Sequence, residues 1–270
     1  MTQSTVQMSV GIAGKVALVT GSLDGIGYAT AQALAGQGCR VMLHGLGDPA
    51  VTEAKRAALE QESGAHVGFD GADLSDPARV DTLFETTERT LGPVEILVNN
   101  AVTRNFHAIE ALPLDRWSYA LAVNLTAPFR LTQLALPGMR ARKWGRIINI
   151  ASSWGMTGTV NRVDYVASKH GMVGLTRATA LETVTDGITC NALCPGSTLT
   201  PHARRQVDER MQRDGTDWDA AARDLLSQRQ PSGRFVMPDQ VAALIVFLCS
   251  SAANEMTATP IAIDGGWQAI

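Results

Sequence analysis

Two residues with titratable side chains, Tyr165 and Lys169, lie four positions apart in segment 164–183, whose pattern predicts a helix. Residues at positions i and i+4 share a helix face, so the Lys169 ammonium can lie near the Tyr165 phenol. A phenol has a reference pKa of about 10, and lowering it to about 7 requires roughly 4 kcal/mol of preferential phenolate stabilisation. A nearby cation contributes to that stabilisation. The pair therefore predicts a group that accepts a proton from a hydroxyl or donates one to a carbonyl oxygen.

Further polar residues follow predicted strands. Ser152 comes directly after a strand and thirteen residues before Tyr165, and its hydroxyl could hold a substrate oxygen on which charge develops. Asn99 and Asn100 end another strand, and Asn124 lies in the next helical stretch. Asparagine at a strand end is also a common turn residue. The alternative for the whole set is structural, with Tyr165 packed in a core and its lysine solvated.

A glycine-rich turn follows the first predicted strand. Gly21, Gly25 and Gly27 are spaced G-x-x-x-G-x-G and lead into a helical pattern. Glycine lets backbone N–H groups approach a pyrophosphate, and the N-terminus of the following helix favours its negative charge. A tight turn alone would also use glycine, but its place after the first strand favours phosphate binding.

These residues are positioned by an alternation of strands and helices. The pattern predicts strands at 15–20, 39–44, 65–69, 96–99, 146–150 and 188–193, and helical stretches at 26–36, 51–62, 78–91, 114–142 and 164–183. Such an alternation needs crossover connections, which produce a parallel sheet with helices on both faces. We therefore expect a single α/β domain over 1–270 with a doubly wound, Rossmann-type sheet. We expect an N-terminal tail at 1–13 and a helical flap over the substrate at 201–230.

Composition excludes several classes of protein. The 270 residues are 45% hydrophobic, and the net charge of −3 leaves no excess of cations for nucleic acid or an anionic membrane surface. The longest apolar run, 241–249, is too short to span a bilayer, and 1–13 has no signal-peptide pattern. We therefore expect a cytoplasmic protein that binds neither nucleic acid nor membrane.

Cysteine and histidine usage gives no sign of a disulfide scaffold or a metal site. The four cysteines are predicted to be reduced and mostly buried: Cys39, Cys190, Cys194 and Cys249. None of the five histidines falls into a cluster with ligand spacing, so we expect no metal.

Taken together, these motifs resemble the short-chain dehydrogenase/reductase family over essentially the whole of 15–267. The resemblance implies a nicotinamide-dependent oxidoreductase that acts on CH–OH groups. It implies a catalytic tetrad of Asn124, Ser152, Tyr165 and Lys169, in which Asn124 holds a water of a proton relay. It also implies that the cofactor is bound by Gly21, Leu23, Asp24, Gly25, Ile26, Gly27, Leu46, Asp73, Leu74, Asn100, Ala101, Tyr165, Lys169, Pro195, Gly196, Thr198 and Thr200. One position departs from the family pattern, because Val102 stands where a glycine is usual.

Within the family the chain is similar to the bacterial D-3-hydroxybutyrate dehydrogenases, for example at 145–152 and 264–267. The expected substrate pocket comprises Arg104, Ser152, Trp154, Arg162, Ser197, Gln206 and Trp267. Gln206 and Trp267 match that group, whereas Arg104 replaces its glutamine, Trp154 its histidine, Arg162 its lysine and Ser197 its tryptophan. Arg162 can still clamp a carboxylate with two hydrogen bonds, and Arg104 can add a second pair of donors.

The leading hypothesis is therefore an NAD-dependent dehydrogenase for a 3-hydroxy acid, 3-hydroxybutyrate or a larger relative. NAD is expected over NADP because neither 22–24 nor 44–46 carries an arginine or lysine for a 2′-phosphate. The alternatives are a carbonyl reductase for neutral ketones or keto esters, and a dinucleotide-binding protein without turnover. The family resemblance further implies a homotetramer.

Overall fold

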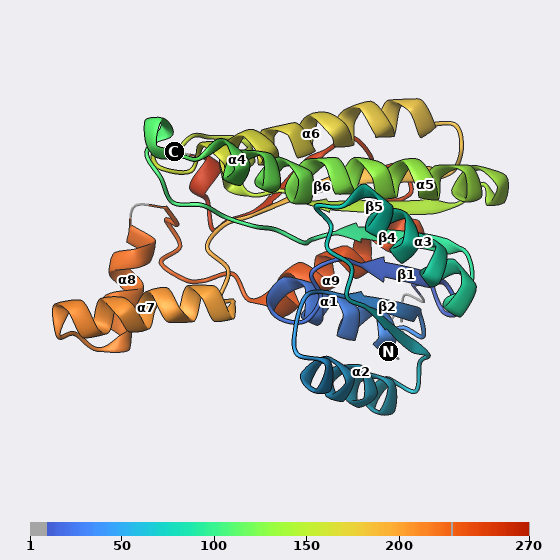
Figure 1. The fold of residues 1–270 in the computed structure, drawn as a ribbon, viewed down its shortest axis with the longest axis horizontal. Coiled ribbons are helices and arrows are strands. Elements are labelled where there is room, and N and C mark those ends of the chain that lie inside the picture. Colours follow the sequence, from blue (N-terminus) through green and yellow to red (C-terminus); the bar gives the residue numbers. More distant parts are fainter. Residues whose placement is uncertain (1–9, 228, 270) are drawn as a thin grey trace, which may run out of the picture.

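The computed structural model describes residues 10–227 and 229–269. Residues 1–9 of the predicted N-terminal tail and residue 228 of the predicted flap therefore lie outside the described chain. The described residues form one parallel sheet covered by helices on both faces, as predicted (Figure 1).

The sheet has seven strands within the described residues, in the order β3-β2-β1-β4-β5-β6-β7. The first six confirm the predicted strands to within a few residues. The strands are β1 (Val16–Val19), β2 (Arg40–His44), β3 (Val67–Asp70), β4 (Val94–Asn99), β5 (Gly145–Ile150), β6 (Ile188–Pro195) and β7 (Pro260–Ile263). The pattern missed β7 because this four-residue edge strand starts with a proline and is only partly buried.

Helices cover the two faces of the sheet in two layers. Alternate residues of β1 enter different apolar clusters, with Ala17 and Val19 on one face and Val16 and Leu18 on the other. Strands buried on both faces read as continuous apolar runs, which is why periodicity located them. In Figure 1, α1, α2 and α9 lie below the sheet, and α4, α5 and α6 lie above it. The layers comprise α1 (Gly25–Gly36), α2 (Pro49–Ser63), α3 (Pro77–Leu91), α4 (Leu114–Leu121), α5 (Ala127–Arg142), α6 (Val163–Thr183) and α9 (Pro238–Cys249).

The order of the strands places a crevice at their carboxyl ends. From β1 the chain proceeds outward to β2 and β3, and then returns to β4 on the other side of β1. The connections after β1 and β4 therefore leave in opposite directions, and ligands of open α/β sheets bind at this point of reversal. The glycine turn follows β1 and Asn100 follows β4, so the topology brings these two sequence motifs together.

The predicted helix over 114–142 is interrupted. Residues Ala122–Thr126 form a single π-helical turn between α4 and α5, and this turn contains Asn124. Extra residues of this kind inside a helix are common at functional sites. Periodicity of 3.6 residues could not locate the interruption, because the segment stays helical on both sides of it.

The segment predicted as a flap forms two helices, α7 (Pro201–Asp214) and α8 (Trp218–Ser227). They pack on each other through a small apolar cluster that includes Val207, Ala221 and Leu225. Figure 1 shows both helices projecting beyond the carboxyl ends of the strands. Their role as a substrate flap stays a prediction. No helical pattern was assigned to α9, because a helix that is apolar on most sides shows little periodicity.

All four cysteines are free and buried, which confirms that prediction. Burial raises the pKa of the Cys190 and Cys249 thiols to about 12, so both are packing residues and poor nucleophiles. In the part of the chain that the structure describes, none of the helices combines the length and apolarity that crossing a bilayer requires.

Candidate active site

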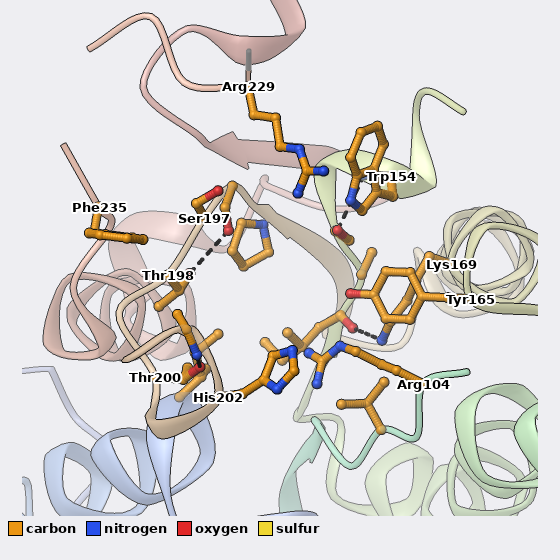
Figure 2. A pocket seen from close by; sticks show the side chains of 18 of the residues that line it. Arg104, Trp154, Tyr165, Lys169, Ser197, Thr198, Thr200, His202, Arg229 and Phe235 are labelled. Carbon is orange, nitrogen blue, oxygen red and sulfur yellow. Dashed lines mark hydrogen bonds between the residues drawn. The ribbon is translucent and has the colours of Figure 1, made fainter. Parts of the chain in front are cut away.

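A cavity opens at the carboxyl ends of β4, β5 and β6 and is bordered by α7 and α8. Its wall contains three of the four predicted catalytic residues, Ser152, Tyr165 and Lys169. Figure 2 shows Tyr165 and Lys169 next to each other at this wall. Residues from β5, α6 and the segment after β6 thus meet in one place, although they are far apart in sequence.

The Tyr165 side chain is almost completely buried, with 6% exposure. Burial alone raises the pKa of this phenol, but the positive charges of Arg104 and Lys169 act against it and lower the pKa below 10. The Ser152 hydroxyl adds to the lowering. The guanidinium carbon of Arg104 lies 5.3 Å from the centre of the Tyr165 ring, and the Lys169 nitrogen lies 5.6 Å from it. The geometry therefore stabilises a phenolate with two cations.

Lys169 is 2% exposed, and its Nζ donates a hydrogen bond of 2.6 Å to the carbonyl oxygen of Ile150. Burial lowers the pKa of this ammonium, while the nearby phenol of Tyr165 raises it. A chain of buried side chains fixes α6 against the sheet. Asn99 donates to Asn149 at 2.8 Å, and Asn149 donates to Thr176 on α6 at 2.8 Å. Asn99 thus has a structural role that its position at a strand end did not reveal.

Ser152 is buried, and its hydroxyl oxygen accepts a hydrogen bond of 3.2 Å from the Trp154 backbone N–H. This bond starts the short 3₁₀ turn Ser153–Gly155 and fixes the side-chain oxygen at the cavity wall. The hydroxyl can still donate its proton to an oxygen placed next to Tyr165.

The fourth predicted catalytic residue, Asn124, lies behind the cavity and not in its wall. Its amide oxygen accepts from the Thr103 N–H at 2.8 Å, and its amide nitrogen donates to the Thr103 carbonyl at 3.0 Å. The same nitrogen is 3.3 Å from the Ser168 hydroxyl. Asn124 therefore holds the segment after β4 that carries Arg104 against α6. Its part in a proton relay stays a prediction.

A groove continues from the cavity along the glycine turn, and the two share Asn100, Val102 and Thr200 among their lining residues. Gly21 and Gly25 adopt positive φ angles of 61° and 52°. A Cβ at Gly21 would lie 2.7 Å from the Ala101 Cα, so only glycine fits where the two strand ends approach. Asp24 begins α1 without capping it by a side-chain hydrogen bond, which leaves the first N–H groups of the helix available. These features fit the pyrophosphate of a dinucleotide.

Most residues predicted to bind the cofactor line this groove or the cavity. The turn residues Gly21, Leu23, Asp24, Gly25 and Ile26 do so together with Leu46, Asn100, Ala101, Pro195, Gly196, Thr198 and Thr200. Gly27 lies behind the turn, where a Cβ would collide with the Gly21 carbonyl.

Two predicted cofactor residues, Asp73 and Leu74, do not line the described cavity or groove. The Asp73 carboxylate accepts from the Ser75 N–H at 2.9 Å, and Leu74 is buried in the core. Contact between these residues and an adenine ring stays a prediction.

The sequence analysis did not predict the role of His44, which holds the glycine turn by a hydrogen bond. Its Nδ1 accepts a hydrogen bond of 3.2 Å from the Gly21 N–H, so its Nε2 carries the proton and donates to the Ala72 carbonyl at 2.9 Å. Burial lowers the pKa of His44 and keeps the ring neutral. The only sequence signal is its position at the end of the second strand.

All predicted substrate residues line the cavity: Arg104, Ser152, Trp154, Arg162, Ser197, Gln206 and Trp267. The rings of Trp154 and Trp267 meet edge to face, with centroids 4.4 Å apart. Arg162 precedes α6 and stacks on Phe106, with 4.1 Å between its guanidinium carbon and the ring centre. The fold thus brings the pocket residues that differ from the hydroxybutyrate dehydrogenases into the same cavity as Tyr165 and Lys169.

The cavity wall also contains His202, Arg229 and Phe235, which the sequence did not single out. His202 lies on α7, and the other two lie between α8 and α9. This part of the chain carries no recognisable sequence motif. No group of acidic, histidine and cysteine side chains suited to a metal occurs within the described residues.

Comparisons with known proteins agree with the geometry. A family model described as short chain dehydrogenase matches residues 15–211. A D-beta-hydroxybutyrate dehydrogenase of Cupriavidus necator is 46% identical over 95% of this chain and 98% of its own length. A protein of the same name from Rhizobium meliloti is 35% identical over 94% of this chain and 99% of its own.

Among solved structures, an L-sorbose reductase from Gluconobacter frateurii, complexed with NADPH and L-sorbose, superposes with a TM-score of 0.91. It is 31% identical, with coverage of 96% of this chain and 98% of that one. The matching sheet, the cavity with its tyrosine, lysine and serine, and these relatives lead to one conclusion. The chain belongs to the short-chain dehydrogenase family and is an oxidoreductase that acts on secondary alcohols and ketones with a nicotinamide dinucleotide.

Proposed function

We propose that the protein interconverts a 3-hydroxy acid and its 3-oxo acid, with 3-hydroxybutyrate or a larger relative as substrate and NAD as cofactor. One observation carries the proposal: Ser152 and Tyr165 share a cavity with the guanidinium groups of Arg104 and Arg162. The names of the relatives from Cupriavidus necator and Rhizobium meliloti support the same substrate class.

The polar residues of the cavity have separate roles in the reaction. The residues of the groove would hold an oxidised nicotinamide dinucleotide, which would supply the acceptor for the hydride of the carbinol carbon. Tyr165, as phenolate, takes the hydroxyl proton, and the Ser152 hydroxyl donates to the same oxygen. Lys169 keeps the phenolate stable and would also bind the ribose of the nicotinamide. In the reverse direction the neutral phenol returns its proton to the carbonyl oxygen.

The substrate carboxylate binds at Arg162, with Arg104 and Gln206 nearby. Arg162 is half-buried, and burial lowers its pKa to about 10, with the charges of Arg104 and Arg229 acting in the same direction. An anion bound to Arg162 stabilises its charge, because the attraction offsets the cost of desolvation and the repulsion from the other arginines. The guanidinium plane also offers two parallel donors to a carboxylate.

The alternative, a reductase for neutral ketones or keto esters, expects both arginines to face solvent. Arg104 is exposed, whereas Arg162 is half-buried between Phe106 and the cavity. The position of Arg162 therefore favours the acid.

The preference for NAD is supported by the groove beside Leu46. The Asp24 carboxylate lines this groove, and the end of β2 carries no arginine or lysine over 44–48. Arg205 is a cation of the same groove, on the side of α7. A 2′-phosphate next to Asp24 would meet repulsion that a 2′-hydroxyl does not.

We extend the proposal to a homotetramer in the cytoplasm, with α7 and α8 as the cover of the substrate pocket. Large apolar side chains on the layer of α4, α5 and α6 are exposed in one chain, among them Leu114, Phe129 and Leu181. Such side chains suit a contact between copies. A mass of one chain, 28.7 kDa, in light scattering would contradict the tetramer. Recovery in a membrane or periplasmic fraction would contradict the location.

Replacement of the proposed base tests the chemistry. We expect Tyr165→Phe to lower kcat for 3-hydroxybutyrate oxidation by about 10³-fold or more, because the substitution removes the group that accepts the hydroxyl proton. Binding of NADH, measured by fluorescence, should persist. The control Tyr119→Phe removes the same hydroxyl from a partly exposed tyrosine on α4 and should remain close to wild type. A Tyr165→Phe enzyme within tenfold of wild type would disprove the assignment.

The charge of Arg104 predicts a pH effect. Oxidation needs the phenolate, so kcat rises with pH through the pKa of Tyr165, which Arg104 lowers. Arg104→Met removes that charge and raises the pKa of Tyr165, so the kcat profile at saturating substrate should move to higher pH. Arg116→Met, an exposed arginine outside the cavity, serves as control. An unmoved profile for Arg104→Met would show that Arg104 does not act on the phenol.

Removal of the proposed carboxylate clamp separates acid from neutral substrates. We expect Arg162→Ala to raise KM for acetoacetate by about 10- to 100-fold, the effect of losing a charge-assisted pair of hydrogen bonds. The neutral ethyl ester should be affected much less, since it offers no anion. Arg177→Ala, on the exposed side of α6, is the matched control. Equal losses on acid and ester would favour the neutral-ketone alternative.

Cofactor preference can be measured directly. We expect kcat/KM for NAD⁺ to exceed that for NADP⁺ by about tenfold or more, because Asp24 repels a 2′-phosphate. Asp24→Asn removes this repulsion and should narrow the ratio by raising the efficiency with NADP⁺. A wild-type enzyme that uses NADP⁺ more efficiently than NAD⁺ would refute the choice.

A further inference from the structure

The cavity holds more positive charge than one carboxylate requires. Its wall contains Arg104, Arg162, Arg229 and Lys169, and no aspartate or glutamate. The chain as a whole carries a net charge of −3, so this concentration of cations is local to the site. A concave, water-poor site of one sign selects ligands of the other sign.

Among the described residues, none of the three arginines of the cavity forms an ion pair with a carboxylate. Five other arginines of the chain do, for example Arg130 with Asp81. Each cavity guanidinium instead lies near an aromatic ring: Arg104 near Tyr165, Arg162 near Phe106 and Arg229 near Trp154. Stacking of this kind orients a guanidinium and leaves its N–H edge available for a ligand.

Arg229 reaches the cavity from a different side than Arg104. In Figure 2, Arg229 enters beside Trp154 and Ser197, whereas Arg104 enters beside His202, and the Tyr165 hydroxyl lies between the two guanidinium groups. The guanidinium carbon of Arg229 is 5.5 Å from the centre of the Trp154 ring. In this view the two cations therefore approach the Tyr165 hydroxyl from different sides.

The Arg229 segment is anchored to the cavity wall. The buried side chain of Gln230 accepts a hydrogen bond of 2.8 Å from the Ser197 N–H, and its amide nitrogen donates to the Arg234 carbonyl. The Arg229 N–H donates to the Leu226 carbonyl at the end of α8, at 2.9 Å. Arg229 is half-buried, and burial lowers the pKa of its guanidinium. A fixed and partly desolvated cation lacks a counter-charge here unless the ligand brings one.

We propose that the preferred substrate is a short hydroxy dicarboxylate, with one carboxylate at Arg104 and Arg162 and the second at Arg229, beside Ser197 and Trp154. This inference rests on the proposed function and narrows its substrate class. The oxidised carbon lies between the two carboxylates, next to Ser152 and Tyr165. An oxidised nicotinamide, when bound, would take the hydride, and Tyr165 takes the proton, so the reaction itself is unchanged. The small Ser197 side chain leaves room for the second carboxylate.

The test compares acids that differ only in the charge of the distal end. The pairs are 3-hydroxyglutarate with 3-hydroxyvalerate and 3-hydroxyadipate with 3-hydroxyhexanoate, each pair having equal carbon count. We expect wild-type kcat/KM to be about 10- to 100-fold higher for the diacid in at least one pair, the effect of one charge-assisted contact. Without cofactor, the preferred diacid should also raise the thermal midpoint more than its monoacid partner does.

Variants then assign the effect to Arg229. Arg229→Met should lower the ratio of kcat/KM for diacid over monoacid by about 10- to 100-fold, and Arg229→Lys should restore part of it. Arg223→Met removes the same charge from an exposed position on α8 and should leave the ratio at the wild-type value. A ratio that does not respond to Arg229→Met overturns the assignment.

Activity on the monoacids distinguishes the dicarboxylate inference from the proposed 3-hydroxy acid function. Oxidation of monoacids as efficiently as diacids, or more so, overturns the dicarboxylate inference and leaves the 3-hydroxy acid function intact. Oxidation of neither class overturns both. Oxidation of diacids with little activity on monoacids supports the inference.

Discussion

A buried phenol between two cations is the interaction on which this site depends. Tyr165 has almost no contact with solvent, and burial alone would make its ionisation harder. Arg104 and Lys169 reverse that effect, but only because both are held close to the ring. The polar chain from Asn99 through Asn149 to Thr176 holds α6, and Asn124 holds the backbone at Thr103. These buried amides position the charges that tune the phenol.

The same logic governs the cofactor side. The β1 and β4 ends approach so closely at Gly21 that a methyl group would collide with Ala101. Asn100 donates to the Gly21 carbonyl at 2.8 Å, and His44 accepts from the Gly21 N–H. The conformation of the turn is therefore fixed by contacts with His44 and Asn100 as well as by its own glycines. The N-terminus of α1 faces the groove. A dinucleotide meets a surface that needs little rearrangement.

Substrate selection depends on a different part of the molecule. Around the reactive pair, the wall is built by aromatic rings with arginines stacked against them. Within the described chain, these three guanidinium groups have no carboxylate partner. Burial partly desolvates Arg162 and Arg229, and the charges of Arg104 and Arg229 repel that of Arg162. Such an arrangement costs stability in the empty protein. An anionic ligand offsets this cost, which connects the stability of the cavity with its selectivity.

The alternation of strands and helices, the glycine turn and the Tyr165–Lys169 pair could be predicted from the sequence, because they follow from local periodicity and spacing. The sequence also singled out Arg104 and Arg162 through their departure from a family pattern. The folded chain was needed to show that Arg229 and His202 border the cavity and that His44 supports the turn. It was also needed to place Asn124 behind the wall, in a π-helical turn. Those roles depend on contacts between residues distant in the chain, for which no local pattern exists. The sequence pattern also failed to predict the edge strand β7 and the mostly apolar helix α9. Both elements are stabilised by packing against distant parts of the chain, which leaves no periodic pattern in their own residues.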